Sequence, residues 1–375
     1  RYIGPLDGHD IKALVRILRR AREDDAPQIL HVVTTKGKGY RPAESSPDAY
    51  HGVAPFLVES GRLPGEANTV CGRVAAAELS ALAENDIRIC AVTAAMPSGT
   101  GMDLFAAEHP QRFYDVGIAE EHAVTMAAGM AAAGMKPYVA IYSTFLQRAF
   151  DQIASDVCLS RLPVTLLIDR AGLVGADGAT HQGVFDLSYL SMLPNMVVAA
   201  PRDVRDLKRL IRLSAEYDGP MAIRYPKDVD DMGARMQTHK PLAVGEWETL
   251  MTGEDVMFLA VGRMVGIAMR ASIELVGKGV HAGVVDARFV KPLDEATLRG
   301  ALGARLLVTV EENVLSGGLG EHVLAYLAAN APGKEVLTLA VPDRFVEHAS
   351  VESQLSTCGL DEQSIVRSVL ARLEK

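Results

Sequence analysis

Two adjacent carboxylates at the mouth of an apolar segment are the first residues whose types and spacing suggest chemistry. Glu120 and Glu121 stand in DVGIAEEHAV, between the strand-like FYDVGI and the uncharged run AVTMAAGMAAAGM. They could simply begin a helix, because the helix dipole favours a carboxylate in the first turn by about 0.3–1 kcal/mol. The run is apolar on every side, however, which predicts a buried helix. Since a buried carboxylate must be paired or hydrogen-bonded, the functional hypothesis is a ligand nitrogen that shares a proton with it.

The segment YSTFLQRAFDQ (142–152) combines aromatic rings with a guanidinium group. Tyr142 and Phe145 could present a ring to a flat heterocycle, and Arg148 could bind an anion. In the alternative interpretation, Phe145 belongs to the core and Arg148 lies on a solvated face.

A third candidate, DRAGLVGADGATHQGVFD (169–186), is rich in glycine. Arg170, Asp177 and His181 stand in it, and four glycines fall between residues 172 and 183. Glycines let a backbone approach a ligand closely, and Asp, His and Arg on such a loop suit acid–base catalysis and anion binding. A mobile surface loop is the alternative.

The elements that must position these residues follow a regular order. From about residue 70 to 230, near-continuous apolar strands alternate with helices, which is typical of a doubly wound, parallel α/β sheet. Ligands of such sheets bind beyond the carboxyl ends of the strands, and all three candidate segments are expected to follow strands. The alternation recurs from residue 255 and predicts a second, smaller α/β domain.

The first fifty residues predict only one helix, within 7–22, and one buried strand in QILHVVTT. Asp7 and Asp10 are the candidate helix caps. One helix and one strand cannot form a core, so we expect this segment to be the tail of an upstream domain. Turn-rich linkers then divide the chain into three predicted parts: 1–66, 67–240 and 241–375.

Composition narrows the classes of function. The chain has 375 residues, a net charge of −9 and no basic stripe, which argues against nucleic acid as a partner. The longest apolar stretch, Ala123 to Met135, is too short to span a bilayer, so we expect no membrane partner. Four scattered cysteines indicate reduced thiols in a cytosolic compartment. The ten histidines show no metal-ligand spacing, and the absence of HExxH and GxSxG excludes zincins and α/β-hydrolases.

Longer motifs resemble a known family. The run from DVGIAEEHAV to FLQRAFDQ resembles the pyrimidine-binding domain of transketolase-type thiamine-diphosphate enzymes. Within that group, DRAGLVGADGATHQGVFDLSYL, YIGPLDGHD, TTKGKGYRPAE, YHGVAPF, RFVKPLDE and VEENVLSGGLG resemble the 1-deoxy-D-xylulose-5-phosphate synthase family. The resemblance implies condensation of pyruvate with D-glyceraldehyde 3-phosphate, with loss of CO2, by a homodimer that uses thiamine diphosphate and Mg2+. It also implies a bacterial cytoplasm, with a plastid as the alternative.

The resemblance assigns cofactor-binding roles to four residues. Glu120 would hydrogen-bond the aminopyrimidine ring and promote its imino tautomer. Phe145 would stack on that ring, Ile118 would pack against the cofactor, and Lys36 would lie near the diphosphate.

The resemblance assigns the substrates to other residues. Those expected to hold the phosphate of the acceptor are Tyr142, Arg170 and Arg224, and arginine suits this role through its fork of donors. Those expected around the donor substrate and the reacting centre are Arg148, Asp177 and His181. His51 would shuttle protons.

Two departures from the family pattern matter. The family usually has Gln where Glu121 stands, which adds a negative charge beside Glu120. The GDG signature of the diphosphate- and metal-binding domain is absent, so the metal ligands are expected upstream, on a separate chain or a missing fragment. The chain is therefore predicted to be the C-terminal portion of the enzyme. The alternatives are a β-type subunit of a 2-oxoacid dehydrogenase or other transketolase-like enzyme, and a non-catalytic dimerisation fragment.

Overall fold

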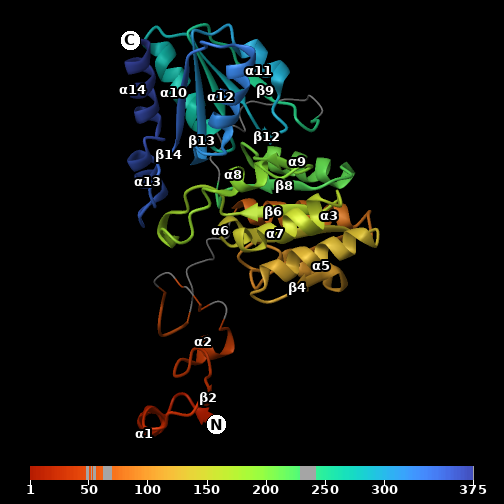
Figure 1. Cartoon of the computed structure of the whole chain (residues 1–375), viewed down its shortest axis with the longest axis vertical. Helices are drawn as coiled ribbons and strands as arrows, with labels where there is room; N and C mark the ends of the chain where they lie inside the picture. The colour runs from red at the N-terminus through yellow and green to blue at the C-terminus, as the bar shows by residue number, and fades with distance from the viewer. Residues whose placement is uncertain (48–49, 52, 54–55, 62–69, 229–241, 375) are drawn as a thin grey trace. The chain divides into compact units, whose positions relative to one another are not determined.

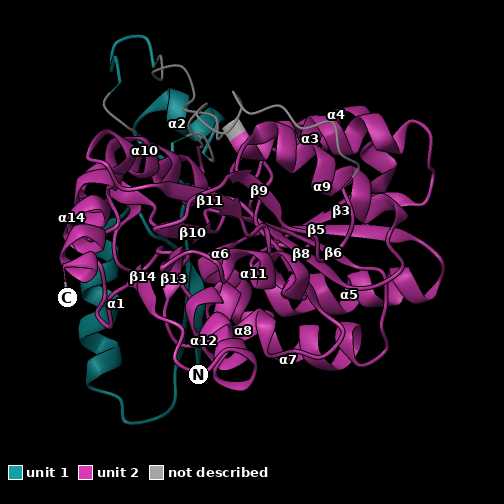
Figure 2. Cartoon of the chain, turned by 90° about the horizontal axis from the view of Figure 1, so that it is seen from above, with its two compact units in different colours: residues 1–67 teal, residues 68–375 magenta. Residues whose placement is uncertain are grey.

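A computed structural model describes residues 1–47, 50–51, 53, 56–61, 70–228 and 242–374. The chain divides into two compact units, residues 1–67 and 68–375 (Figures 1 and 2).

The first unit is built around a two-stranded parallel sheet. Its elements are β1 (Tyr2–Asp7), α1 (Ile11–Arg22), β2 (Ile29–Val33) and α2 (Arg41–Ser45). The Asp10 carboxylate accepts a hydrogen bond from the Ala13 N–H at 2.9 Å, as expected of a helix cap. The prediction of a buried strand was wrong, because four of the five residues of β2 are exposed. The sequence also missed β1, whose pairing with β2 is not visible in local periodicity.

The second unit contains a seven-stranded sheet with the order β12-β7-β8-β6-β5-β3-β4. Its strands are β3 (Ile89–Thr93), β4 (Phe113–Asp115), β5 (Lys136–Tyr142), β6 (Thr165–Asp169), β7 (Val197–Ala199), β8 (Met221–Arg224) and β12 (Phe289–Lys291). All neighbours pair in parallel except β12, which lies antiparallel to β7 at the edge. Most of these strands are apolar throughout because helices cover both faces of the sheet.

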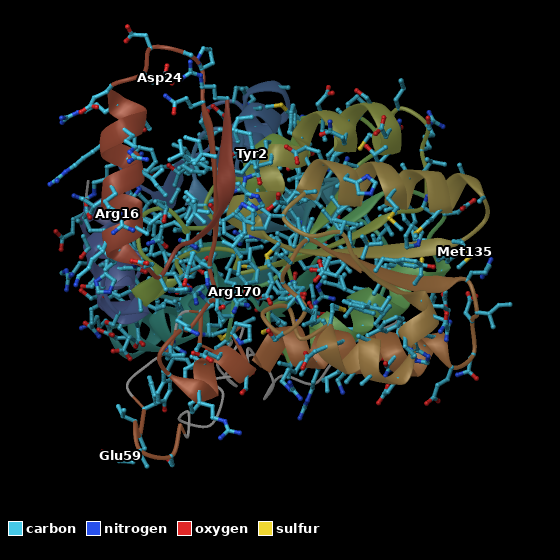
Figure 3. All side chains as sticks on the ribbon, turned by 90° about the horizontal axis from the view of Figure 1, so that it is seen from below. Tyr2, Arg16, Asp24, Glu59, Met135 and Arg170 are labelled. Carbon is cyan, nitrogen blue, oxygen red and sulfur yellow. The ribbon has the colours of Figure 1, made fainter. Side chains whose placement is uncertain are left out.

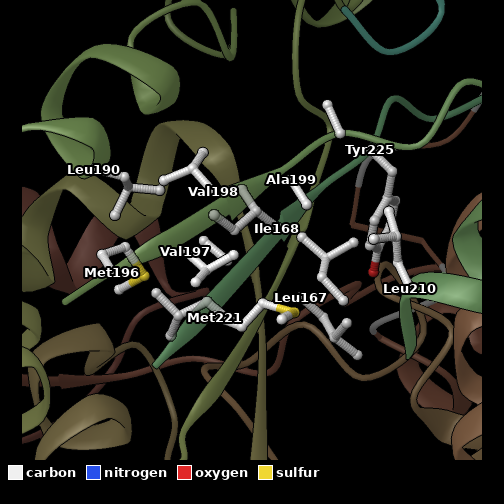
Figure 4. Close-up of a cluster of buried hydrophobic side chains, with 14 of the residues drawn as sticks. Leu167, Ile168, Leu190, Met196, Val197, Val198, Ala199, Leu210, Met221 and Tyr225 are labelled. Carbon is white, nitrogen blue, oxygen red and sulfur yellow. The ribbon is translucent and has the colours of Figure 1, made fainter. Parts of the chain in front are cut away.

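Figure 2 shows α3, α4 and α9 on one side of this sheet and α5, α7 and α8 on the other. The helices are α3 (Val70–Ala83), α4 (Asp103–Glu108), α5 (Glu120–Ala132), α8 (Asp186–Ser191) and α9 (Val204–Glu216), with 3-10 turns η1 (Pro110–Arg112) and η4 (Gly175–Asp177). The single helix predicted after β5 is instead segmented into α6 (Ser143–Leu146), η2 (Gln147–Ala149), α7 (Phe150–Gln152) and a π-helical η3 (Ile153–Cys158). Figure 4 shows the core that β6, β7 and β8 share, with Leu167, Val197 and Met221 among its side chains.

A five-stranded sheet with the order β14-β13-β10-β11-β9 follows in the same unit. Its strands are β9 (Glu248–Met251), β10 (Val256–Ala260), β11 (Ala282–Asp286), β13 (Leu306–Val314) and β14 (Val336–Val341). Its helices are α10 (Met264–Gly277), α11 (Glu295–Ala301), α12 (Leu319–Asn330), α13 (Val351–Cys358) and α14 (Glu362–Leu373). Figure 1 shows α10 and α14 on one side of the sheet and α11 and α12 on the other.

The predicted fold class, a doubly wound sheet followed by a smaller α/β domain, is confirmed. One predicted strand, VHAGVVDARFV, divides between the sheets: β11 joins the smaller sheet and β12 joins the larger one. Strand β9 and helices α13 and α14 were not predicted. No helix in the described part of the chain is long and apolar enough to cross a bilayer.

Candidate active site

The carboxyl ends of neighbouring strands bring the candidate segments together. Tyr142 ends β5 and is the register partner of Asp169, which ends β6. Arg170 follows at once, and α5 begins with Glu120 just after β4. Arg170 and Met135, which precedes β5, lie at opposite ends of the sheet (Figure 3). The site is therefore at the edge where parallel sheets bind ligands.

The two glutamates at the start of α5 have opposite environments. The Glu120 side chain is buried, whereas Glu121 is exposed. An Nη1 of Arg148 donates to Glu120 Oε1 at 2.5 Å, so the buried carboxylate has a cationic partner. The expectation that α5 is buried on every side was wrong. The chain leaves one face of it exposed, with Glu121, His122, Thr125, Gly129 and Ala132.

Aromatic rings continue the line of contacts that begins at Glu120. The Arg148 guanidinium carbon lies 4.9 Å from the centre of the Phe145 ring. That ring stacks on Tyr142, with centroids 5.8 Å apart, and meets the His181 ring edge-on at 5.5 Å. The Arg170 guanidinium lies 4.0 Å from the centre of the Tyr142 ring. The structure thus joins six of the predicted residues in one network: Glu120, Tyr142, Phe145, Arg148, Arg170 and His181.

A pocket of about 450 Å³ opens beside this network. It is lined by Thr144, Phe145, Gln147, Arg148, Thr180 and His181. Phe145 packs partly against the core and also lines the pocket, and its role toward a flat heterocycle stays a prediction. The pocket combines an aromatic face with one fixed cation and one imidazole, a combination suited to a small charged ligand.

Arg170 and Tyr142 lie in an unusual electrostatic environment. Arg170 Nη1 donates to Gly99 O at 2.6 Å and to Asp169 Oδ2 at 2.9 Å. Burial raises the pKa of Asp169 to about 6, although Arg170 lowers it. Burial also raises the pKa of Tyr142 to about 12. Within the described residues, the buried Nε of Arg170 has no hydrogen-bond partner, and Arg170 adopts a left-handed φ of 56°. An unpaired buried donor and a strained backbone are both features that concentrate at ligand sites.

Comparison with known proteins decides the family. Residues 71–229 match the transketolase pyrimidine-binding domain, residues 245–365 match the transketolase C-terminal domain, and residues 1–34 match a 1-deoxy-D-xylulose-5-phosphate synthase model. The 1-deoxy-D-xylulose-5-phosphate synthase of Aquifex aeolicus is 48% identical over 374 residues, which cover 98% of this chain and 59% of the relative. That of Caldanaerobacter subterraneus subsp. tengcongensis is 46% identical over 376 residues, with coverages of 100% and 60%.

A solved structure agrees with this result. A split-gene transketolase, described as an inactive β4 tetramer, is 30% identical with a TM-score of 0.72, and the match covers 80% of this chain and 97% of that one. The chain belongs to the 1-deoxy-D-xylulose-5-phosphate synthase family of transketolase-like proteins. It spans about three fifths of the length of the curated relatives it matches.

Four residues expected from the family lie outside the network. Ile118 precedes α5 with its side chain 81% exposed, and Asp177 is exposed in η4. Lys36 and His51 both belong to the first unit, where Lys36 Nζ lies 2.9 Å from His51 Nδ1. Their roles in this synthase family member stay predictions.

Arg224 is used inside the protein. Its side chain is buried, and Nε donates to Asp186 Oδ1 at 3.1 Å. Its Nη2 donates to the carbonyls of Gly183 at 3.0 Å and Glu312 at 3.2 Å. The predicted role of Arg224 in phosphate binding would require some of these bonds to be exchanged.

Two groups at the site were missed by sequence reasoning. Asp169 received no role, although a carboxylate that ends the apolar strand LLID is itself a signal of a buried ion pair. Gly99 lies in the loop after β3, and a Cβ there would overlap the Tyr142 hydroxyl. Two glycines in SGTG directly after a predicted strand could have indicated this close approach. The described residues contain no group of three or more His, Cys, Asp or Glu that could hold a metal ion.

Proposed function

We propose that the chain is part of an enzyme that condenses pyruvate with D-glyceraldehyde 3-phosphate, with loss of CO2, to form 1-deoxy-D-xylulose 5-phosphate. The observation that carries this proposal is the Glu120 carboxylate, which is buried at the start of α5 and bound to Arg148 beside the pocket. The identity of 46–48% to named synthases along the whole chain supports the same reaction.

The residues present fit thiamine diphosphate. When bound, this cofactor supplies the chemistry that breaks and forms bonds at a carbonyl carbon. Glu120 would share a proton between its carboxylate and the pyrimidine ring of the cofactor. This hydrogen bond would be stronger than in water, because the dielectric constant is low around a buried carboxylate. Phe145 would lie against the pyrimidine ring, with Ile118 nearby. A carboxylate accepts several hydrogen bonds, so the contact with Arg148 leaves acceptor capacity on Glu120.

The substrates would use the rest of the network. Arg170, with its unpaired Nε, would bind the phosphate of the acceptor. The Tyr142 hydroxyl, whose pKa burial raises from the ordinary 10 to about 12, would be protonated at neutral pH and would donate to the same phosphate. Arg148 and His181 line the pocket, where Arg148 would bind the pyruvate carboxylate and His181 would transfer protons. Asp177 would act from the adjoining loop.

The exposed surface of the first unit is evidence that a further portion of the protein covers it. Its elements expose many apolar side chains: Tyr2, Ile11, Val15, Leu18, Ile29, Val32 and Val33. Such a surface is usually covered, and the curated relatives are longer than this chain by about two fifths of their length. We propose that this remaining portion covers the first unit and supplies the Mg2+ ligands.

Association with a second copy is also part of the proposal. The exposed face of α5 carries the small residues Thr125, Gly129 and Ala132, which suits close contact with another copy. The related split-gene transketolase forms an inactive tetramer, as its description states. We therefore expect this chain to associate with itself as a homodimer or larger assembly, and to be inactive alone. A cytoplasmic location stays a prediction.

The test is to combine the chain with the portion that its relatives have in addition, and to supply thiamine diphosphate, Mg2+ and both substrates. The expected result is formation of 1-deoxy-D-xylulose 5-phosphate together with one CO2 per product. Acyl transfer to lipoamide without use of glyceraldehyde 3-phosphate would instead identify a 2-oxoacid dehydrogenase β-type subunit. Self-association without either reaction would identify a non-catalytic dimerisation fragment.

A further inference from the structure

The loop that carries Asp177 and His181 is held by side chains of the smaller α/β domain. We define residues 172–183 as the substrate loop. Gly172 and Gly183 close its base, because the N–H of each donates to the carbonyl of the other at 2.6 and 2.8 Å. We propose that Gln354 on α13 is a positioning residue, which fixes the substrate loop so that His181 lines the pocket. The role of His181 in this inference rests on the proposed function.

Both the oxygen and the nitrogen of the Gln354 carboxamide form hydrogen bonds that hold the substrate loop. Its side chain is 1% exposed. The Oε1 accepts a hydrogen bond from the Gly175 N–H at 2.9 Å, and Nε2 donates to Gly175 O at 3.2 Å and to Glu347 O at 2.9 Å. The side chain therefore pairs with both backbone groups of Gly175, as a neighbouring strand would. Because the carboxamide is buried, losing it leaves backbone groups of Gly175 and Glu347 without these hydrogen-bond partners, which is costly inside a protein.

Two further side chains hold the neighbouring backbone. Glu312 on β13 accepts from the Leu173 N–H at 3.0 Å, and Gln182 Oε1 accepts from the Val174 N–H at 2.8 Å. Gln182 Nε2 also reaches Val346 O at 3.3 Å. Three consecutive N–H groups of the substrate loop, those of Leu173, Val174 and Gly175, thus depend on side chains for their hydrogen bonds. These three N–H groups take no part in sheet or helix hydrogen bonds, so the side chains help to determine the path of the segment.

The backbone of the loop lies close against the smaller domain. Gly172 and Gly175 have φ values of +83° and +72°, which favour glycine. A Cβ on Gly172 would come within 2.8 Å of the Glu312 carboxyl group, and one on Gly175 would come within 3.1 Å of Val351. The two glycines therefore allow the loop backbone to lie close to the smaller domain, and the side chains of Gln354, Glu312 and Gln182 hold it there by hydrogen bonds.

Two turns connect Gln354 to His181. The Gly178 N–H donates to Gly175 O at 3.2 Å, and the His181 N–H donates to Gly178 O at 3.0 Å. Gly175 O is also an acceptor for Gln354. A shift of Gly175 would therefore move His181, although Gln354 is not among the residues that line the pocket. Small displacements of a reacting group can reduce turnover by about a hundredfold.

The variant Gln354→Met tests the inference, because methionine has a similar length and no hydrogen-bonding groups. Gln363→Met is the matched control, since Gln363 is an exposed glutamine on α14 that bonds to Glu274. In hydrogen exchange on the chain itself, amides of the substrate loop should exchange at least about tenfold faster in Gln354→Met, with β6 and α5 unchanged. The control should leave all of these rates unchanged.

The completed enzyme gives the second readout. Gln354→Met should lower kcat by about ten- to a hundredfold and change the KM values for both substrates by less than about threefold. A loss of folded protein alone would lower the active fraction and leave kcat per folded molecule unchanged. If Gln354→Met does not fold, Gln182→Met removes a different bond of the same loop and should reproduce both effects.

Unchanged exchange in the substrate loop would overturn the inference, as would faster exchange with an unchanged kcat. If the unmodified complete protein forms no 1-deoxy-D-xylulose 5-phosphate, the proposed function fails. The exchange experiment then still decides whether Gln354 holds the loop.

Discussion

At the scale of single residues, Glu120 and Glu121 show that two adjacent residues of the same type can differ completely in burial and in their partners. Successive residues of an α-helix point about 100° apart. One glutamate therefore turns toward Arg148, and the other turns toward solvent. The buried carboxylate has a fixed partner, whereas the exposed one is screened by water.

The pair offers a matched test of the proton-sharing role. Glu120→Gln should lower kcat of the completed enzyme by about 10²- to 10⁴-fold, because an amide cannot take up the shared proton. Glu121→Gln should change kcat by less than about twofold. Steady-state rates of product formation with saturating cofactor measure both. Equal rates for Glu120→Gln and the unmodified enzyme would show that the assignment of Glu120 is wrong.

Arg224 is expected to matter first for stability. Replacing it with Met leaves the fully buried Asp186 without its cation, which should lower the free energy of unfolding by about 3–5 kcal/mol. Arg372→Met is the control, because that arginine forms an ion pair with Glu335 in which both side chains are well exposed; it should cost less than about 1 kcal/mol. Urea denaturation followed by circular dichroism measures both. If Arg224→Met changes the free energy of unfolding only slightly, the result would instead favour the predicted role of Arg224 in binding the phosphate of the substrate.

At the scale of elements, the motif VEENVLSGGLG connects β13 to α12 through a buried carboxylate. Glu311 accepts hydrogen bonds from the N–H groups of Leu319 and Gly320, at 2.9 and 2.8 Å. A Cβ on Gly318 would overlap the Glu311 carboxyl group, so glycine is required at that point of the turn. The glycines of this motif thus allow the start of a helix.

Glu311 makes the stability of this junction depend on pH. Burial raises its pKa from the ordinary 4.5 to about 7, although the two N–H groups lower it. The folded state therefore favours the protonated form, and the contribution of Glu311 is fully present below pH 4.5 and is lost as the pH rises through 7.

The variant Glu311→Gln cannot titrate. The unfolding free energy of the unmodified chain, relative to that of the variant, should decrease between about pH 4.5 and 7 and level off above that range. Urea denaturation of both proteins at several pH values gives this difference, in which the other titrating groups cancel. A difference that does not vary with pH would contradict the burial effect.

At the scale of the whole molecule, the two sheets of residues 68–375 form one compact unit. Strand β12 comes from the C-terminal third of the chain but extends the larger sheet beside β7. Beside this crossing, Asp286 accepts from Arg202 at 2.9 Å and from Arg288 at 2.6 Å, and all three side chains are buried. Separating the sheets would expose this network and an open strand edge.

We therefore expect the two sheets to unfold together. The single tryptophan, Trp247, is buried at the junction and donates from Nε1 to Phe289 O at 2.7 Å. Its fluorescence and the far-UV circular dichroism should report the same urea midpoint, apart from a small early change as α1 of the first unit unfolds. Two well-separated transitions would show that the sheets are independent domains.

The sequence by itself determined the class of fold, most of the elements and the edge of the sheet where the candidate residues meet. Helix and strand periodicity are local properties that can be read from the sequence. Because parallel sheets bind ligands at the carboxyl ends of their strands, the order of the strands then predicts which residues lie at that edge. Six predicted residues meet there for this reason. The tertiary structure alone decided which glutamate is buried, that Arg224 is used internally, and that β12 changes sheets. It also decided that Gln354 bonds to Gly175, 179 residues away in the chain. Contacts of this kind depend on long-range packing, on which neither hydropathy nor spacing along the chain gives information.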